Sequence, residues 1–319
     1  DTSRTVDLES IRNLDVVLGG RTGQSLNGRP SYSFVDAQGR MGIINRLENR
    51  VYFFSSTDGQ LLDTLELNSA GRVIRPEGLE QINDSLWVVF SKSNYPDTPP
   101  QLKDKRLHLF DQDGNWIQAL NTEYLEAKIK ARSQEPNEPY FISVEAESPM
   151  IFHEGMLYIP FNKSYPNEFT FPVVGRINPF DPEDCEVLPI DYPQCYLNKD
   201  SLVIPHIRYM NVQLAEGPDQ LIVSFPGVPI CFSYEYASQK VDTFFTFSRF
   251  LDLNQPATIS RNDPATFNEL EMRHGRYGQF IYSEEHDAFV RIINQPHRGE
   301  KVRNRKYYRD KTATLLLYD

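Results

Sequence analysis

Short apolar runs alternate with polar turns along most of this 319-residue chain. Within the runs apolar and polar positions tend to alternate, and β-branched and aromatic residues dominate the apolar set, which favours β-strands. The intervening segments "DAQG" and "STDG" contain Gly and Asp, residues that tolerate the positive φ angles of tight hairpins. We therefore predict four antiparallel strands in a first unit, at residues 31–35, 40–45, 50–55 and 60–67.

The same order of strands and turns recurs down the chain, and "LWVVFSKSNYP" (86–96) is nearly repeated as "LYIPFNKSYPN" (157–167). The predicted second strands are anchored at Leu86, Leu157, Leu221 and Phe289, at spacings of 71, 64 and 68 residues. This period is typical of a repeat protein with loop insertions. The strands predicted for the later units are 79–82, 86–91, 106–110 and 116–120; 149–152, 156–161, 173–178 and 186–190; 204–214, 221–225, 230–236 and 241–247; and 277–282, 288–293 and 312–318.

Repeated four-stranded antiparallel units pack most economically as blades around an axis, because only short edges are then left open. The sequence therefore predicts an all-β fold, a β-propeller of five or six blades in which residues 1–319 form a single domain. A sixth blade would lie in residues 248–276 or beyond residue 319, and a pair of β-sandwiches is the alternative architecture. Because the fifth unit is one strand short, residues 5–8 or 14–18 are expected to close the last blade.

Two short helical inserts are expected between blades. Residues 121–134 place Leu125 and Ile129 at i and i+4, with Asn121 or Thr122 as the cap. Residues 263–275 begin with Asp263 and Pro264 and end at a glycine, which is the usual order of helix start and stop signals.

Strand direction divides the connections of a propeller between two ends of the molecule. Tight turns join first to second and third to fourth strands at one end, which we call the turn end. The other connections leave at the opposite end, which we call the loop end. Long loops on a rigid scaffold commonly carry binding, so we expect the loop end to be the working face. The long or unusual segments expected there are 68–78, 92–105, 121–148, 162–172, 191–203, 248–276 and 294–311.

The blade arrangement accounts for the repeated "KSNYP" and "KSYP", because both segments follow a second strand and lie at the loop end. Tyr95 and Tyr165 would offer stiff aromatic contact surface there, although common ancestry of the repeats accounts for the likeness equally well.

The opening residues of each first strand enter the axial channel from the loop end, and they are mostly polar. Arg can bind a carboxylate or phosphate through two parallel hydrogen bonds, so a pocket for a small polar or anionic ligand is expected. A wet polar channel without a specific ligand is the alternative. The candidate ligand-binding residues are Tyr32, Arg75, Glu77, Glu145, Glu147, His206, Arg208, Tyr209, His274, Arg276 and Tyr277.

The composition limits the classes of partner and site that the protein can have. The net charge of −11 disfavours nucleic acid and anionic membrane, although residues 298–311 carry a local excess of five positive charges. Cys185, Cys195 and Cys231 lack the spacing of a zinc site, and a Cys185–Cys195 bridge is geometrically conceivable. No apolar run reaches the ~18 residues of a membrane span.

Chemical motifs are mostly absent: the sequence contains no G-x-S-x-G, H-E-x-x-H, P-loop or G-x-G-x-x-G. We therefore expect no catalytic residue, no metal and no cofactor, and favour a binding protein over an enzyme. His286 lies among acidic residues in a predicted turn, where a solvated cluster is expected, and "DQDGNW" (111–116) is interpreted as a hairpin turn. The alternative function is a carbohydrate-active hydrolase with axial carboxylates, using Glu77 with Glu145 or Glu147 as acid and base.

The chain resembles uncharacterised β-propeller lipoproteins of Bacteroidetes, a six-bladed-propeller-like group containing domains of unknown function. The resemblance rests on "NRVYFFSSTDGQLLDTL" (49–65), "KRLHLFDQDGNWIQAL" (105–120) and "RYGQFIYSEEHDAFVRIINQP" (276–296). It implies export, an N-terminal lipid anchor as the sole membrane contact, and a periplasmic or outer-membrane address. We expect a monomer that binds a small polar or anionic ligand, a glycan or a protein partner, and no nucleic acid.

Overall fold

The fold is an all-β propeller of four-stranded antiparallel blades, as the sequence predicted. The structure is a computed structural model in which the described residues are 32–36, 38–46, 48–68, 76–91, 106–133, 140–142, 148–163, 170–196, 203–205, 211–248, 251, 258–260, 275–295 and 313–318.

Five sheets form the blades, and in each sheet four strands, or three in blade 5, follow one another in chain order. Their strands are, for blade 1, β1 (Tyr32–Val35), β2 (Met41–Asn45), β3 (Arg50–Phe54) and β4 (Leu61–Glu66); for blade 2, β5 (Pro76–Asn83), β6 (Leu86–Ser91), β7 (Leu107–Asp111) and β8 (Trp116–Ala119); for blade 3, β10 (Ile151–His153), β11 (Met156–Lys163), β12 (Val174–Ile177) and β13 (Cys185–Val187); for blade 4, β15 (Gln213–Glu216), β16 (Gln220–Ser224), β17 (Ile230–Glu235) and β18 (Val241–Phe245); and for blade 5, β20 (Arg276–Ser283), β21 (Ala288–Asn294) and β22 (Ala313–Tyr318). In blade 3 a further strand, β9 (Tyr140–Ile142), pairs with the second strand outside this order.

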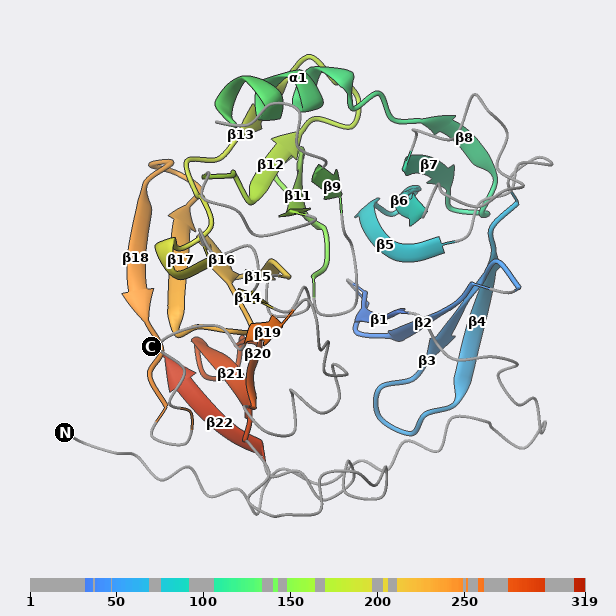
Figure 1. The fold of residues 1–319 in the computed structure, drawn as a ribbon. Helices are drawn as coiled ribbons and strands as arrows, with labels where there is room; N and C mark the ends of the chain where they lie inside the picture. The colour runs from blue at the N-terminus through green and yellow to red at the C-terminus, as the bar shows by residue number, and fades with distance from the viewer. Residues whose placement is uncertain are drawn as a thin grey trace.

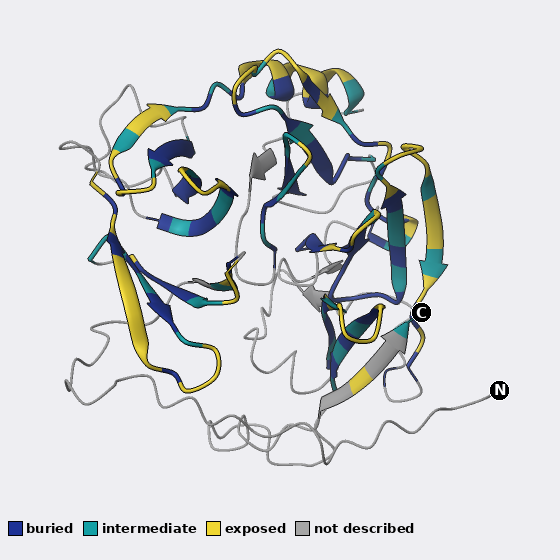
Figure 2. Ribbon diagram, turned by 180° about the vertical axis from the view of Figure 1, so that it is seen from behind, coloured by how far each residue is buried: buried dark blue, intermediate teal, exposed yellow. Residues whose placement is uncertain are grey.

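The blades fan in sequence order around a common centre, with their first strands innermost (Figure 1). Strand β5 contacts β2 and β10, and β15 contacts β10 and β20, so successive blades pack through their inner strands. Burial follows this layout, because second strands such as β6 and β16 are largely buried whereas outer strands such as β4 and β18 are largely exposed (Figure 2). The core is therefore formed between blades.

The fourth blade differs from the prediction at its first strand, which was expected at residues 204–214. The first strand is β15, and residues further upstream form β14 (Val203–Pro205), which pairs with β19 (Thr258–Ser260) in a separate two-stranded sheet. Just before β15 the Val212 N–H donates to Asn162 Oδ1 of blade 3 at 3.0 Å, and Pro205 at the end of β14 has no N–H to donate. The described part of residues 248–276 therefore adds strand β19 to this small sheet, and no sixth blade is formed by described residues.

The predicted insert at 121–134 is helix α1 (Glu123–Arg132), which covers the outer edge of blade 3. Leu125 and Ile129 are buried as the i, i+4 spacing predicted. On the polar side Lys128 donates to the Cys185 carbonyl, and Arg132 donates to the Leu188 carbonyl. These bonds occupy backbone acceptors at a strand edge that would otherwise be open. The insert predicted at 263–275 lies outside the described residues except for Gly275.

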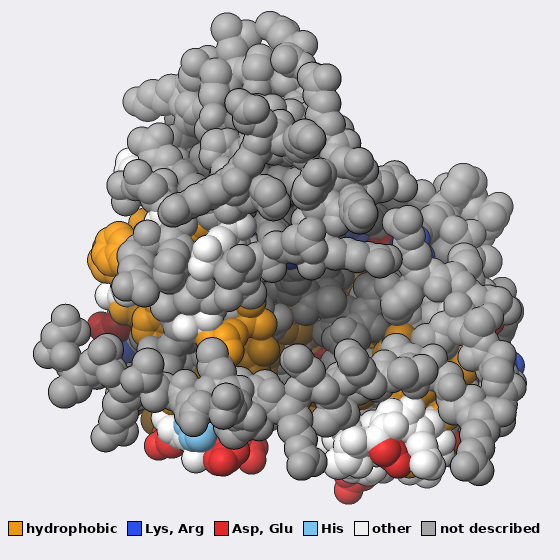
Figure 3. All heavy atoms as spheres, turned by 90° about the horizontal axis from the view of Figure 1, so that it is seen from below, with side chains coloured by type: hydrophobic (Ala, Val, Ile, Leu, Met, Phe, Trp, Pro, Cys, Tyr) orange, Lys and Arg blue, Asp and Glu red, His pale blue; other side chains and the backbone are white. Residues whose placement is uncertain are grey.

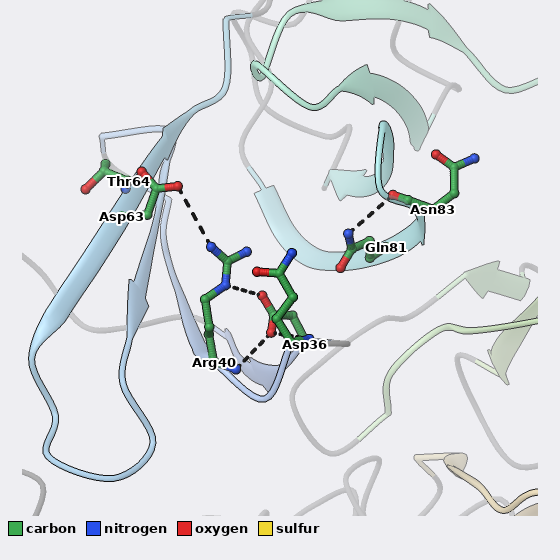
Figure 4. A network of polar contacts seen from close by, with 7 residues as sticks. Asp36, Arg40, Asp63, Thr64, Gln81 and Asn83 are labelled. Atoms are coloured by element: carbon green, nitrogen blue, oxygen red, sulfur yellow. Dashed lines mark hydrogen bonds and ion pairs between the residues drawn. The ribbon is translucent and has the colours of Figure 1, made fainter.

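The tight turns are fixed by side-chain hydrogen bonds, and the turn between β1 and β2 shows how (Figure 4). Asp36 Oδ1 accepts the N–H groups of Gln38 and Arg40 at 3.0 and 2.8 Å. The Arg40 side chain donates to Asp36 Oδ2 at 2.7 Å and lies 3.9 Å from Asp63 of the outer strand. One Asp–Arg pair therefore ties the inner and outer strands of blade 1 together at the turn end.

Two further expectations are settled by the described residues. Cys185, Cys195 and Cys231 are free thiols, so the conceivable Cys185–Cys195 bridge is not formed. Among the described residues, no helix has the length and apolar character needed to cross a membrane.

Candidate functional site

The sorting of connections between two ends follows from the antiparallel order of every blade. Connections from first to second and from third to fourth strands are short, as in 84–85 or 217–219. The other group includes 92–106 between β6 and β7 and 295–312 between β21 and β22. Most of this second group lies outside the described residues, including residues 298–311, Tyr95 and Tyr165.

Four of the predicted pocket residues fall within the described part of the chain: Tyr32, Glu77, Arg276 and Tyr277. Tyr32 begins β1, Glu77 lies at the start of β5, and Arg276 and Tyr277 begin β20, so all four occupy the loop end of first strands as expected. The remaining candidates lie outside the described residues, namely Arg75, Glu145, Glu147, His206, Arg208, Tyr209 and His274.

Glu77 takes part in an ion pair between blades 1 and 2. Arg46 Nη1, in the connection from β2 to β3, lies 3.5 Å from Glu77 Oε1. The Glu77 side chain is 14% exposed and that of Arg46 is 46% exposed, so the pair lies at the surface of the loop end with the carboxylate on its inner side. An incoming ligand at this point would meet a guanidinium before a carboxylate.

Tyr277 is only 1% exposed, and its side chain packs between blades rather than facing an open channel. The Arg291 guanidinium lies over its ring, 4.5 Å from the centroid. Burial raises the pKa of Tyr277, against the opposing charge of Arg291. The tyrosine therefore supports the junction of blades 4 and 5, whereas its neighbour Arg276 is partly exposed.

Arg291 itself is completely buried and joins blade 5 to the loop ends of three strands of blade 4, β16, β17 and β18. Its Nε donates to the Gly278 carbonyl at 3.1 Å and its Nη2 to the Phe225 carbonyl at 3.0 Å. Its Nη1 donates to Thr246 Oγ1 and to Cys231 Sγ. These neutral acceptors, with the aromatic rings of Tyr277 and Phe280, replace the hydration of the charge.

Sequence reasoning missed a cluster of titratable groups at the turn end, where the first strands of blades 2, 3 and 4 finish. Glu80 of β5 accepts the Phe152 N–H at 3.0 Å through Oε1. His153 of β10, which follows Phe152 in the chain, forms a hydrogen bond of 3.0 Å between its Nδ1 and Glu216 Oε1 of β15. The Glu80–His153–Glu216 cluster therefore spans three consecutive blades.

Aromatic side chains border this cluster on the side of blade 4. The imidazole of His153 stacks on the ring of Tyr236, with centroids 3.7 Å apart and an interplanar angle of 11°. The ring centroid of Tyr158 lies 5.6 Å from that of Tyr236. The hydroxyl groups of Tyr234 and Tyr236 are both inaccessible and have no hydrogen-bond partner in the described part of the chain. Burial raises the pKa of Tyr236, and the charge of Glu216 adds to that effect.

The two carboxyl groups of the cluster lie in different electrostatic surroundings, which affect their pKa values differently. Burial raises the pKa of Glu80 to about 8, and the negative charge of Glu216 reinforces the shift. Burial also raises the pKa of Glu216, but the hydrogen bond and charge of His153 oppose the rise. Near neutral pH the cluster therefore holds a protonated carboxyl that can donate and a second carboxyl already hydrogen-bonded to an imidazole.

A faint sequence signal for this cluster exists, since each of its members lies in the second half of a first strand and His153 and Glu216 end theirs. The turns that follow differ in length, as "IND", "HEG" and "EGPD" show, so the three positions do not align at a fixed spacing. The described residues contain no group of His, Cys, Asp and Glu arranged to hold a metal ion.

The turn end also carries the expected charged turn of blade 5. Glu284, Glu285, His286 and Asp287 are all exposed, which agrees with a solvated turn. Seen from below, described acidic side chains and a histidine lie along one margin of the molecule (Figure 3).

No family model and no curated protein matches this sequence. Among solved structures, the chain is similar to a member of the DUF4221 family from Bacteroides vulgatus, with a TM-score of 0.57 and 12% identity, over 90% of this chain and 76% of that one. It also matches a protein named as the extracellular domain of a one-component system from Bacteroides thetaiotaomicron, with a TM-score of 0.43 and 10% identity, over 88% and 36%. A third match is a protein named as exported from Bacteroides fragilis, with a TM-score of 0.41 and 12% identity, over 83% and 66%. At such identities the likeness to the DUF4221 protein shows the fold alone.

Proposed function

We propose that this protein is an exported, monomeric binding propeller whose loop end takes up a small polar or anionic ligand, a glycan or a protein partner. The observation that carries the proposal is the segregation of connections, with short turns at one end and long segments such as 92–106 and 295–312 at the other. Long loops on a rigid scaffold can vary in shape without loss of the fold, and for this reason they commonly form binding surfaces.

The described residues of the loop end favour an anionic or hydrogen-bonding ligand. Arg46 is nearly half exposed in front of Glu77, and Arg276 opens the innermost strand of blade 5. A guanidinium presents several N–H groups in one plane, which suits carboxylate, phosphate and sugar oxygens. Export through a lipoprotein signal to the periplasm or outer membrane rests on the resemblance to Bacteroidetes lipoproteins, and cell fractionation of the native protein tests it.

Thermal-shift screening against panels of glycans and anionic metabolites tests the binding proposal. A ligand that binds only the folded state stabilises it by about 2.7 kcal/mol at a hundredfold excess over Kd. We expect Arg276→Ala and Arg46→Ala to weaken the response. The matched control is Lys240→Ala, which removes an exposed cation from the turn between β17 and β18 at the turn end. Equal responses from all three variants and the parent protein would contradict a site at the loop end.

One observation favours a second candidate function, hydrolysis of a glycoside at the turn end. Glu80 and Glu216 combine a protonated carboxyl with a second carboxyl oriented by His153, the division of roles that glycosidases use. This pair differs from Glu77 with Glu145 or Glu147, the pair considered from sequence, of which Glu145 and Glu147 lie outside the described residues. Chromogenic glycosides separate the two functions, because a hydrolase would lose turnover in Glu80→Gln and Glu216→Gln, whereas a binding protein has no turnover to lose.

A further inference from the structure

Two buried side-chain amides have unpaired N–H groups at the loop end, where blades 3 and 4 meet. Asn162 is the last but one residue of β11 and Gln213 is the first residue of β15, two strands of neighbouring blades (Figure 1). Asn162 is 1% exposed and Gln213 is completely buried. In the described part of the chain, neither Asn162 Nδ2 nor Gln213 Nε2 has a hydrogen-bond partner. A buried donor without a partner is costly, so both groups call for an acceptor from outside the described residues.

The oxygen atoms of the same two amides are held by protein donors. Asn162 Oδ1 accepts the Val212 N–H at 3.0 Å and the Tyr192 hydroxyl at 3.4 Å. Gln213 Oε1 accepts the Ser224 hydroxyl at 3.3 Å. Because Val212 directly precedes Gln213, these bonds place both amides at one junction. Their NH₂ groups are therefore the donors that this junction offers to a ligand.

The described polar groups around the junction are uncharged. The Ser148 hydroxyl donates to the Val212 carbonyl. Phe225 is completely buried and packs on Tyr192, with ring centroids 5.6 Å apart. The guanidinium of Arg291 bonds the Phe225 carbonyl and other acceptors between blades 4 and 5. An anion enclosed among neutral amides, hydroxyls and aromatic rings would lose its hydration without gaining a countercharge, so the junction favours an uncharged group.

The Gln213 amide can accept a hydrogen bond as well as donate one. Its Oε1 has two lone pairs, and among the described residues only the Ser224 hydroxyl donates to it. A ligand hydroxyl likewise donates one proton and accepts an N–H, whereas a carbonyl or carboxylate oxygen only accepts. A hydroxyl group therefore satisfies this side chain more fully than the other oxygen groups do.

We propose that the loop end binds an uncharged saccharide, with one sugar hydroxyl seated between Asn162 Nδ2 and the Gln213 amide. This inference rests on the proposed function of the loop end, and it narrows the ligand to one chemical class. It also assigns the choice of ligand to two neutral side chains rather than to arginine. A site built to hydrogen-bond a hydroxyl rejects analogues that cannot do so, because its own buried groups then stay unpaired.

Calorimetric titration and thermal shift of the full chain test the inference. The probes are glucose, galactose, N-acetylglucosamine and their disaccharides, with glucuronate and galacturonate as charged counterparts. We expect at least one neutral sugar to bind, and to bind more tightly than its uronate. Gln213→Met keeps the length of the side chain without the amide and should weaken that binding roughly tenfold or more.

Two further variants separate the lost donors from a general disturbance. Asn162→Asp keeps an oxygen for the Val212 N–H but removes the NH₂ group, so it should weaken sugar binding as well. The matched control is Gln118→Met, the same replacement at an exposed position of β8, which should bind like the parent protein.

The melting temperature of the protein without ligand gives a second readout. Gln213→Met should melt above the parent protein, because it removes buried N–H groups that have no partner. A lower melting temperature would show that an internal water already satisfies the amide, and it would overturn the inference.

The failure of this inference differs from the failure of the proposed function. Sugar binding of equal strength in Gln213→Met and the parent would overturn the role of the amides and leave the loop end as a binding surface. Binding of anions alone, weakened by Arg276→Ala and unchanged in Gln213→Met, would do the same. No response of the parent protein to any neutral or anionic probe would contradict both.

Discussion

Replacing Glu80 by Gln should change how the stability of the propeller depends on pH. The amide keeps the shape of the side chain and an oxygen for the Phe152 N–H, which lies 3.0 Å from Glu80 Oε1. The amide cannot ionise, so the variant lacks the titration of the Glu80 carboxyl group. In the parent protein the folded state holds the Glu80 proton more tightly than the unfolded chain does, because burial raises its pKa from 4.5 to about 8. The stability contributed by this proton is complete below the unfolded pKa and is lost as the pH rises through about 8.

The magnitude follows from the size of the shift. A change from 4.5 to about 8 corresponds to an upper bound of about 5 kcal/mol, at ~1.4 kcal/mol for each pKa unit. Because Glu80 keeps some contact with solvent, screening reduces the effect, and we expect about 2–3 kcal/mol. Glu80→Gln should therefore gain about 2–3 kcal/mol of unfolding free energy relative to the parent between pH 5 and pH 8.5.

Urea denaturation of both proteins at several pH values measures this difference, and titrating groups that do not interact with Glu80 cancel in the comparison. Glu66→Gln, which removes an exposed carboxylate from β4, controls for the change of one unit in net charge. A stability difference between Glu80→Gln and the parent that stays constant within about 0.5 kcal/mol across the range would refute the buried carboxylic acid.

Three further predictions concern the scaffold. Arg291→Met leaves the Gly278 and Phe225 carbonyls without their donors, so it should lower the unfolding free energy in urea denaturation by about 2–4 kcal/mol. Arg291→Lys keeps the charge and one N–H bond, so it should lower it by less. Equal losses in the two variants would contradict the bonding role of the guanidinium. Gly114→Ala should be far more costly than Gly39→Ala, although both glycines have positive φ, because a Cβ at 114 would clash with the Glu66 carbonyl oxygen whereas that at 39 meets open space. We expect about 1–2 kcal/mol for Gly39→Ala and more than about 3 for Gly114→Ala, and a smaller cost at 114 would show that the turn can shift. Leu125→Ala should lower stability by about 2–5 kcal/mol and Tyr124→Ala by less than about 1, since Leu125 is 1% and Tyr124 45% exposed; thermal melts of the pair check whether α1 is anchored to blade 3.

Local sequence was sufficient for most of the architecture. The strand at 86–91 and the helix around Leu125 and Ile129 were predicted nearly to the residue, because side-chain period and turn chemistry are properties of neighbouring positions. The loop and turn ends followed from strand alternation alone. The prediction failed at residues 204–214, where "IPHIRYMNVQL" had indicated one continuous strand. The Asn162 side chain, 50 residues away, takes the Val212 N–H, and such a distant partner leaves no local signal.

For the candidate site, too, one part follows from the sequence and another only from the tertiary structure. The sequence by itself determined that these residues form blades, since alternation, turn residues and repeat spacing each act over a few positions. Only the tertiary structure brought Glu80, His153 and Glu216 together, because they come from three different blades at unequal spacings. It also buried Tyr277 beneath Arg291, whereas sequence placed Tyr277 at a channel mouth. A pattern along one strand states which way a side chain points, but its neighbours, its burial and hence its charge depend on how separate blades pack.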